Sequence, residues 1–299
     1  MKKILIDLYL KAKDMCDFIK NDFIAQKFMR QPIVHGAEES IELILTQRAS
    51  MCRYGDGEFS LMQGVNLKFQ KYSLELEREL KSIINSREKD IVVCIPDVFR
   101  ELDQYITRAE KYWAKYLHTN RYNIYKLIDR KKEYWDTQIT RFYVDYKDKS
   151  MMDEKVKKLR AIWKEQDILI VEGEKSRLGM GNDLFDNVSS IERIVCPAIN
   201  AYEKIDKIEN GVMKNTKQRE KLILIALGPT ATVLAYRLAR RGYWALDIGH
   251  IDIEYEWYLK GVEEKCPIAN KYIGEIPNGD VVGDNIDGIY NKQIIERIS

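Results

Sequence analysis

The sequence predicts an α/β protein with a Rossmann-like, mostly parallel sheet that helices cover on both faces. Short apolar runs alternate with helical periodicity from about residue 50 onward, which is typical of successive strand and helix units. These runs lack polar alternation, as expected for strands that are buried on both faces. A chain of 299 residues, 45% hydrophobic and with a net charge of +2, can also bury a sizeable core.

The individual elements follow from the length and the period of each apolar pattern. Runs of four to seven residues rich in Val, Ile and Leu predict strands over 50–54, 90–95, 167–172, 193–196, 221–227 and 244–248. Apolar residues at steps of three and four predict helices over 39–47, 74–85, 100–130, 152–164, 202–217 and 230–241.

The chain is expected to form one α/β domain over residues 35–275, with a different segment at each end. Residues 1–34 carry an amphipathic pattern that predicts a packing helix, a homodimer contact, or a helix that lies on a membrane with its lysines facing anionic lipid. Residues 276–299 are acidic and rich in turn-forming residues at their start, and are expected to be a surface tail.

Residues 100–164 are expected to be a helical insertion, because basic and aromatic residues gather there while the rest of the chain is net negative. The aromatic side chains could be buried in an ordinary helical segment. They could also bind sugars, phosphates or single-stranded nucleic acid. The near-neutral charge of the whole chain argues against nucleic acid as its partner.

The cysteines and the N-terminus indicate a cytoplasmic protein. The five cysteines are an odd number without a CxxC pair, which favours reduced thiols. Charged residues interrupt the N-terminal apolar stretch, and no apolar run is long enough to span a bilayer, so neither a signal peptide nor a transmembrane helix is expected.

The first candidate for chemistry is the segment from Arg53 to Phe59, directly after a predicted strand. Its two glycines allow a sharp turn, and Asp56 and Glu58 can converge on one hard cation through oxygen ligands. An ordinary acidic turn is the alternative. The position favours a site, since ligands in open α/β sheets lie beyond the carboxyl ends of strands.

Two further segments could bind phosphate. Residues 172–184 place Lys175 and Arg177 among three glycines, a combination that suits a diphosphate or forms a structural turn. The Gly228-Pro229-Thr230 segment begins a predicted helix, whose free N–H groups could hold an anion. The alternative for this second segment is a helix start with small residues for close packing.

The fourth candidate is His250, one of only three histidines in the chain. It follows a predicted strand and precedes Asp252, Glu254 and Glu256. These residues could supply metal ligands, a general base or contacts to a ribose.

Taken in order, these segments resemble the family of bacterial glycosyltransferases with the GT-D fold, over residues 35–275. The matching segments are 53–58, 177–184, 197–201, 228–231 and 247–257, with 140–143 in the basic aromatic region. The resemblance implies that donor-binding residues are found among Arg53, Gly55, Arg177, Gly179, Asn182, Asp183, Asn200, Gly228, Pro229, Thr230 and Asp252.

The resemblance also implies an activity: transfer of a hexose, such as glucose or galactose, from a UDP-sugar to a lipid-linked or protein-linked glycan, assisted by Mn²⁺ or Mg²⁺. Asp56 and Glu58 correspond to the family's DxE motif, and His250 lies in the segment beside the metal and the diphosphate. These three residues are therefore the expected catalytic and metal-binding residues. Asp56 could instead be the base that deprotonates the acceptor.

Two other functions remain open on the sequence. One is metal-dependent hydrolysis of a nucleotide sugar or phosphoester, with water in place of the acceptor. The other is a non-enzymatic module that binds glycan or nucleic acid through residues 100–164.

Overall fold

The computed structural model describes residues 2–217, 220–284 and 287–299, with side chains from Ile4 onward. Within these residues the strands form one sheet in which every pair of neighbours is parallel. The strands are β1 (Ile33–His35), β2 (Ser50–Arg53), β3 (Ile91–Ile95), β4 (Glu133–Asp136), β5 (Asp167–Gly173), β6 (Ser190–Cys196), β7 (Leu222–Ala226), β8 (Trp244–Asp247) and β9 (Ile294–Arg297). Their order across the sheet is β1-β4-β3-β2-β8-β7-β5-β6-β9.

The α/β fold and all six expected strands are confirmed, with ends that differ from the expected ones by no more than three residues. The sequence analysis missed β1, β4 and β9. They have only three or four residues, and the burial of β4 and β9 alternates with exposure, so no continuous apolar run marks them.

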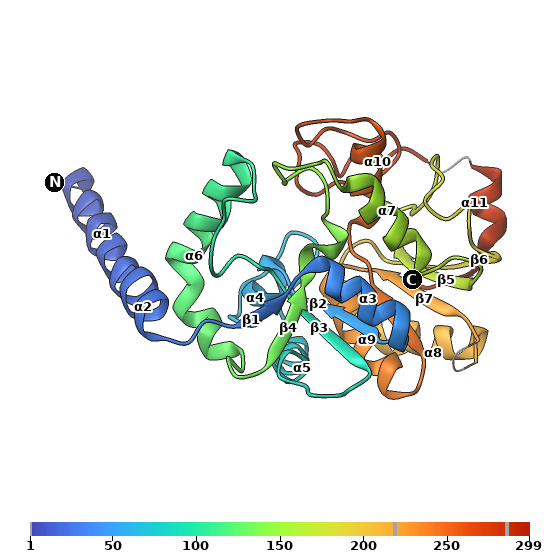
Figure 1. Cartoon of the computed structure of the whole chain (residues 1–299), viewed down its shortest axis with the longest axis horizontal. Helices are drawn as coiled ribbons and strands as arrows, with labels where there is room; N and C mark the ends of the chain where they lie inside the picture. Colours follow the sequence, from blue (N-terminus) through green and yellow to red (C-terminus); the bar gives the residue numbers. More distant parts are fainter. Residues whose placement is uncertain (1, 218–219, 285–286) are drawn as a thin grey trace.

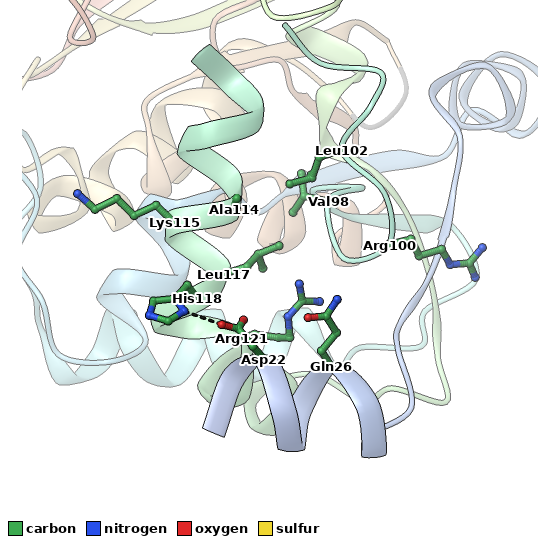
Figure 2. A pocket seen from close by; sticks show the side chains of 10 residues that line it. All are labelled: Asp22, Gln26, Val98, Arg100, Leu102, Ala114, Lys115, Leu117, His118 and Arg121. Atoms are coloured by element: carbon green, nitrogen blue, oxygen red, sulfur yellow. Dashed lines mark hydrogen bonds and ion pairs between the residues drawn. The ribbon is translucent and has the colours of Figure 1, made fainter. Parts of the chain in front are cut away.

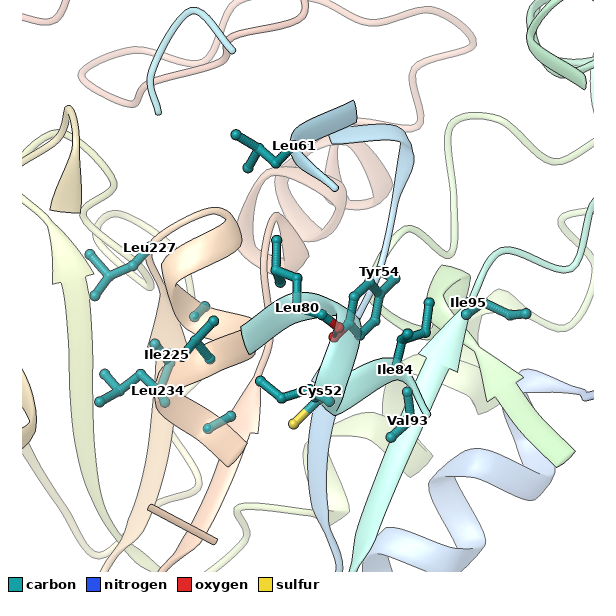
Figure 3. Packing of buried hydrophobic residues seen from close by; sticks show 14 of the residues in the cluster. Cys52, Tyr54, Leu61, Leu80, Ile84, Val93, Ile95, Ile225, Leu227 and Leu234 are labelled. Carbon is teal, nitrogen blue, oxygen red and sulfur yellow. Dashed lines mark hydrogen bonds between the residues drawn. The ribbon is translucent and has the colours of Figure 1, made fainter. Parts of the chain in front are cut away.

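Helices cover both faces of the sheet (Figure 1). The helices of the main body are α3 (Ala37–Gln47), α4 (Asp56–Leu61), α5 (Leu74–Ile84), α6 (Thr107–Leu127), α7 (Met152–Ala161), α8 (Ile205–Asn215), α9 (Pro229–Arg240), α10 (Ile251–Leu259) and α11 (Gly288–Gln293). Side chains alternate across each strand, so that Cys52 and Val93 face one core, with α5, α6, α8 and α9, while Met51 and Val92 face a second core, with α3, α7 and α10. Figure 3 shows the first core, where Leu80 of α5 and Leu234 of α9 pack beside β2 and β7.

The basic aromatic region is a folded part of this body. Its helix is shorter than expected, and Trp113 and Tyr125 of α6 are buried in the first core, as is Tyr105 before it. Most of its aromatic side chains are therefore packed in the body of the protein, which agrees with our first alternative, that they are buried in an ordinary helical segment. Tyr112 is the exception, since it is 49% exposed.

The C-terminal segment is not the surface tail that we expected. Strand β9 extends the sheet beside β6, and the N–H of Ile298 donates to the carbonyl of Val195 at 2.9 Å. The buried Tyr290 donates its hydroxyl to Glu172 at 2.9 Å, and Glu172 also pairs with the buried Arg193 at 2.6 Å. Part of the acidic stretch, residues 285–286, lies outside the described residues.

The N-terminal helical segment projects from the body and lies beside α6 (Figure 1). It consists of α1 (Lys2–Asp17), a π-helical stretch (Phe18–Ala25) and α2 (Gln26–Phe28). The apolar residues that predicted it, Ile4, Leu8, Met15, Ile19 and Phe23, are all 45% exposed or more, so this chain alone does not bury them. Among the described residues, no helix is both long and apolar enough to cross a membrane.

His118 of α6 attaches this segment to the body (Figure 2). Its Nδ1 lies 2.6 Å from an oxygen of Asp22, and its Nε2 lies 3.2 Å from an oxygen of Asp14. Asn21 accepts a further hydrogen bond from the N–H of Tyr122 at 2.8 Å. The hydrogen bond to Asp22 is the main cause that raises the pKa of His118 above its ordinary value.

We expect attachment of the N-terminal segment to weaken as the pH rises. A histidine whose pKa is raised by its partners stabilises the attached state below its unperturbed pKa near 6.5, and this contribution is lost as the pH passes its raised pKa. Amide-exchange protection of residues 4–28 should therefore be higher at pH 6 than at pH 8.5. In His118→Gln the pH difference should vanish, and a wild-type protein with equal protection at both pH values would contradict the prediction.

Candidate active site

The candidate active site lies where the two halves of the sheet meet. Strands β2 and β8 are neighbours, but the chain leaves β2 toward β3 and β4, and leaves β8 toward β9 on the opposite side. Such a switch point opens a crevice at the carboxyl ends of the strands, where open α/β sheets bind ligands. The segments that begin at Arg53 and at Asp247 both start at this point.

Arg53 joins these two segments. Its Nε lies 3.9 Å from Oδ1 of Asp247, and its Nη1 donates to the hydroxyl of Thr140. Thr232 of α9 donates its hydroxyl to the carbonyl of Arg53 at 2.7 Å. Gly249 has a φ of +46°, and a Cβ there would lie 2.4 Å from Nη2 of Arg53. Only glycine therefore lets the guanidinium lie against the backbone after β8.

The two acidic residues of the DxE motif start α4 and have different partners. Glu58 accepts a hydrogen bond from the N–H of Gly55 at 2.7 Å, which caps the helix. Burial is the main cause that raises the pKa of Glu58 to about 7. Asp56 is exposed and accepts a hydrogen bond from the hydroxyl of Tyr112, which α6 brings to the site.

His250 directly precedes α10 and lies in a cationic environment. Its Nδ1 is buried without a hydrogen-bond partner among the described residues, 3.6 Å from Oε1 of Glu275. Glu275 also pairs with Arg141 and Lys265. Burial, followed by the charge of Arg141, lowers the pKa of His250 to about 3, so its imidazole is neutral.

The acidic segment and the His250 cluster are close enough to influence one another. Burial raises the pKa of Tyr112, and the charges of Asp56 and Glu275 raise it further. Burial alone would also raise the pKa of Glu275, but the adjacent Arg141 holds it well below its usual range. The site thus combines three cationic groups, Arg53, Arg141 and Lys265, with carboxylates that pair with them, those of Asp247, Glu275 and Asp145.

Sequence reasoning did not identify Tyr112, Lys265 and Glu275 as site residues. They lie outside the motifs along the chain, and only tertiary packing brings them to the switch point. The one sequence signal for Tyr112 was its place among the aromatic residues of the basic region 100–164, and its exposure became known only from the structure. Arg141 entered only through the family resemblance.

A preformed metal site is absent from the described residues, in which no group of three His, Cys, Asp or Glu side chains surrounds a common point. Asp56, Glu58 and His250 each have separate neighbours instead. The residues do fit a cation held by one or two carboxylates together with phosphate oxygens of a ligand, a common arrangement for Mg²⁺. The unpartnered nitrogen of His250 is a further potential ligand.

The glycine-rich segment after β5 is fastened to its surroundings. The guanidinium of Arg177 is buried and donates to the carbonyl oxygens of Asn270 at 3.0 Å and Gly283 at 2.5 Å. Asp252 of α10 accepts hydrogen bonds from the N–H of Gly179 at 2.9 Å and the amide of Asn182 at 2.8 Å.

Further contacts of two carboxylates, those of Asp252 and Asp183, also hold this segment in place. Asp252 also pairs with the buried Lys271 at 2.7 Å. Asp183 accepts from Arg160 and from Tyr255 of α10, both at 2.8 Å. In this structure the segment therefore positions α10, which begins directly after His250, and its side chains are engaged with protein groups.

The segment after β7 holds the loop that joins α4 to α5. Gly228 has a φ of +54°, and a Cβ there would lie 2.8 Å from the ring of Phe69. The buried hydroxyl of Thr230 lies 3.4 Å from Oε1 of Gln70. From the segment after β6, Asn200 also holds this loop, since it accepts a hydrogen bond from the N–H of Lys71 at 2.8 Å. Pro229 occupies the first turn of α9, where its missing N–H costs nothing.

Comparisons with known proteins agree with this architecture. Residues 51–276 match the family described as "Glycosyltransferase GT-D fold". The chain is similar to the glycosyltransferase GlyD of Streptococcus pneumoniae, at 37% identity over 281 residues, and to the probable glycosyl transferase Gly of Streptococcus gordonii, at 38% over 277 residues. Each match covers 92% of this chain, which spans only 34% and 40% of the length of these relatives.

Solved structures give the same result. One, described as a highly conserved domain of unknown function 1792 with a distinct glycosyltransferase fold, has a TM-score of 0.87 at 38% identity, over 93% of this chain and 99% of that one. Another, described as a new glycosyltransferase from Streptococcus sanguinis, has a TM-score of 0.85 at 37% identity, over 90% of this chain and 100% of that one. The chain belongs to the family of glycosyltransferases with the GT-D fold.

Proposed function

We propose that this chain transfers a hexose, glucose or galactose, from a UDP-sugar to a glycan acceptor at the switch point between β2 and β8. The observation that carries the proposal is the cluster of Arg53, Arg141 and Lys265 around a neutral His250, at the carboxyl edge of the sheet in a GT-D glycosyltransferase. Departure of UDP builds negative charge on its β-phosphate. Cations that are already in place stabilise this charge without reorganisation.

The proposal includes a divalent cation, Mn²⁺ or Mg²⁺, that binds together with the donor diphosphate. Asp56 and Glu58 would hold it, with His250 as a further ligand. When bound, such an ion acts as a Lewis acid that neutralises phosphate charge. Arg53 and Arg141 orient the diphosphate, and the exposed Asp56 is the carboxylate that an acceptor hydroxyl can approach.

The acceptor in this proposal is a lipid-linked or protein-linked saccharide of surface polysaccharide or glycoprotein synthesis, and the reaction takes place in the cytoplasm at the inner face of the membrane. The exposed apolar side chains of the N-terminal segment support contact with a membrane surface or with a second copy of the chain.

The first test is thermal stability with UDP, with Mn²⁺ and with both. A ligand that binds only the folded state stabilises it by about 2.7 kcal/mol at a hundred times its dissociation constant, so UDP and Mn²⁺ together should raise the melting temperature more than either alone. Glu58→Ala should abolish this joint shift. Glu39→Ala is the matched control, because Glu39 caps α3 as Glu58 caps α4, and its N–H bond is 2.8 Å long.

Both variants should lose about 1 kcal/mol of stability with the cap, and only Glu58→Ala should lose the joint shift. Absence of any joint shift in the wild-type protein would remove the support for a metal-bridged nucleotide site.

Asp56→Asn distinguishes the two roles open to this residue. If Asp56 is the base, the variant should keep the joint shift of UDP and Mn²⁺ and lose sugar transfer by at least about a hundredfold, since general base catalysis contributes that much or more. If Asp56 is a metal ligand, the joint shift and the transfer should fall together. Analysis of products with and without acceptor also separates transfer from hydrolysis of the donor. Asp56→Asn that retains full transfer would exclude both roles.

Gly249→Ala should impair the site through Arg53. A methyl group there would displace the guanidinium, and we expect UDP release from the donor to fall by about tenfold or more, the loss that one weakened charge-assisted contact of about 1.4 kcal/mol produces. Gly261→Ala is the control, because Gly261 also has a positive φ, +60°, but a Cβ there meets nothing within 4 Å. Both variants bear backbone strain, so equal activities would show that Arg53 does not depend on Gly249.

A further inference from the structure

A cavity opens at the carboxyl edge of the sheet, beyond the ends of β1, β3 and β4. Its volume is about 480 Å³. The residues on which the argument depends are Asp97, Tyr105, Asp136, Tyr146 and Lys155, all of which line it. All of them except Asp97 lie in residues 100–164, the basic aromatic region, and none belongs to the site between β2 and β8.

Two charged groups in this cavity are incompletely satisfied. Asp136 is only 5% exposed, and its Oδ1 accepts from the N–H groups of Gln138 at 2.9 Å and Asp97 at 3.4 Å. Its second oxygen accepts no hydrogen bond from any residue that the structure describes. The ammonium of Lys155 has no hydrogen bond or ion pair among those residues either, and lies 4.9 Å from the centre of the Tyr146 ring.

Burial shifts the pKa values of both groups. It raises the pKa of Asp136 to about 7 and lowers the pKa of Lys155. Neither the second oxygen of Asp136 nor the ammonium of Lys155 is among the fully buried atoms without a partner, so both can form hydrogen bonds with a ligand in the cavity.

Aromatic rings complete the wall of the cavity. The rings of Tyr105 and Tyr146 lie 5.2 Å apart at an angle of 46°. Tyr105 is fully buried and supports the ring of Tyr146, which is partly exposed and can pack against the apolar C–H face of a sugar ring. A carboxylate accepts from sugar hydroxyl groups, and an ammonium donates to them. Asp97 and Asp136 together disfavour a phosphate. The lining therefore suits a neutral polyhydroxylated ligand.

The cavity is linked to the donor site by a short 3₁₀ turn, η2 (Thr137–Thr140). Asp136 caps the start of η2, and Thr140 at its end accepts the hydrogen bond from Arg53. Four residues of 3₁₀ helix span about 8 Å. Strand β4 is also two strands from β2, which is about 10 Å across a sheet. This separation is within reach of an oligosaccharide that enters the donor site at one end.

We propose that this cavity binds a saccharide unit of the acceptor glycan, adjacent to the unit whose hydroxyl group is glycosylated. The inference rests on the proposed glycosyltransferase function and adds a location for the acceptor. The cavity would let the enzyme recognise an acceptor of two or more sugar units over a monosaccharide.

The test measures binding of lactose, cellobiose and N-acetylglucosamine to the full chain by saturation-transfer NMR, followed by UDP release from UDP-glucose and UDP-galactose with Mn²⁺ in the presence of each. We expect at least one of these sugars to bind saturably. Lys155→Met and Asp136→Asn should each weaken its binding by about tenfold, a factor that corresponds to 1.4 kcal/mol. Lys157→Met, on an exposed position of α7, is the matched control and should bind as the wild-type protein does.

The outcomes separate this inference from the proposed function. The joint shift with UDP and Mn²⁺ should be unchanged in Lys155→Met and Asp136→Asn, which also shows that both variants are folded. If that shift is present but no sugar binds, the cavity is not an acceptor subsite. The same conclusion follows if a sugar binds equally well to the wild-type protein and to all three variants. If the wild-type protein shows neither the joint shift nor UDP release, the proposed function fails, whatever the sugars do.

Discussion

The structure depends on the junction between β2 and β8, which joins the two halves of the sheet. Within the described strands, Met51 and Leu246 form the only backbone pair across it, so side chains supply much of the connection. The hydroxyl of Ser50 donates to the carbonyl of Tyr243 at 3.3 Å and accepts from the N–H of Ala245 at 3.1 Å. Above these contacts, Thr232 binds both the carbonyl of Arg53 and the carboxylate of Asp247. The junction that holds the sheet together therefore also places the residues of the site.

The electrostatics of the site follow from burial. Glu58 and Glu254 both have pKa values raised to about 7, chiefly by burial. Glu254 accepts from the N–H groups of Tyr143 and Val144, both at 3.0 Å, and thereby holds the segment that carries Arg141. The segment that brings cationic charge to the site is thus attached to the helix that follows His250. A dianionic diphosphate that enters this region would meet Arg53, Arg141 and Lys265 in positions that the fold has already determined.

The sequence predicted the fold well and the site in part. Long apolar runs such as 167–172 and 221–227 identified buried strands, because burial on both faces leaves a continuous pattern. The short strands β1, β4 and β9 carry no such pattern. Their places in the sheet depend on the strands with which they pair. The positions of Asp56, Glu58 and His250 beside the switch point followed from strand ends. The contributions of Tyr112, Lys265 and Glu275 could not be predicted, because contacts between distant segments create them.

The motif residues also divide into two kinds that a sequence pattern does not distinguish. Arg53, Asp56 and His250 lie at the site, whereas Arg177, Gly179, Asn182 and Asp252 are engaged with one another or with backbone carbonyls around α10. Asp252 accepts from three donors on two segments, so its carboxylate has little capacity left for a ribose. A residue can belong to a motif because it holds the helix that presents a ligand-binding group. In this fold the glycine-rich segment after β5 fixes the position of α10, which begins directly after His250.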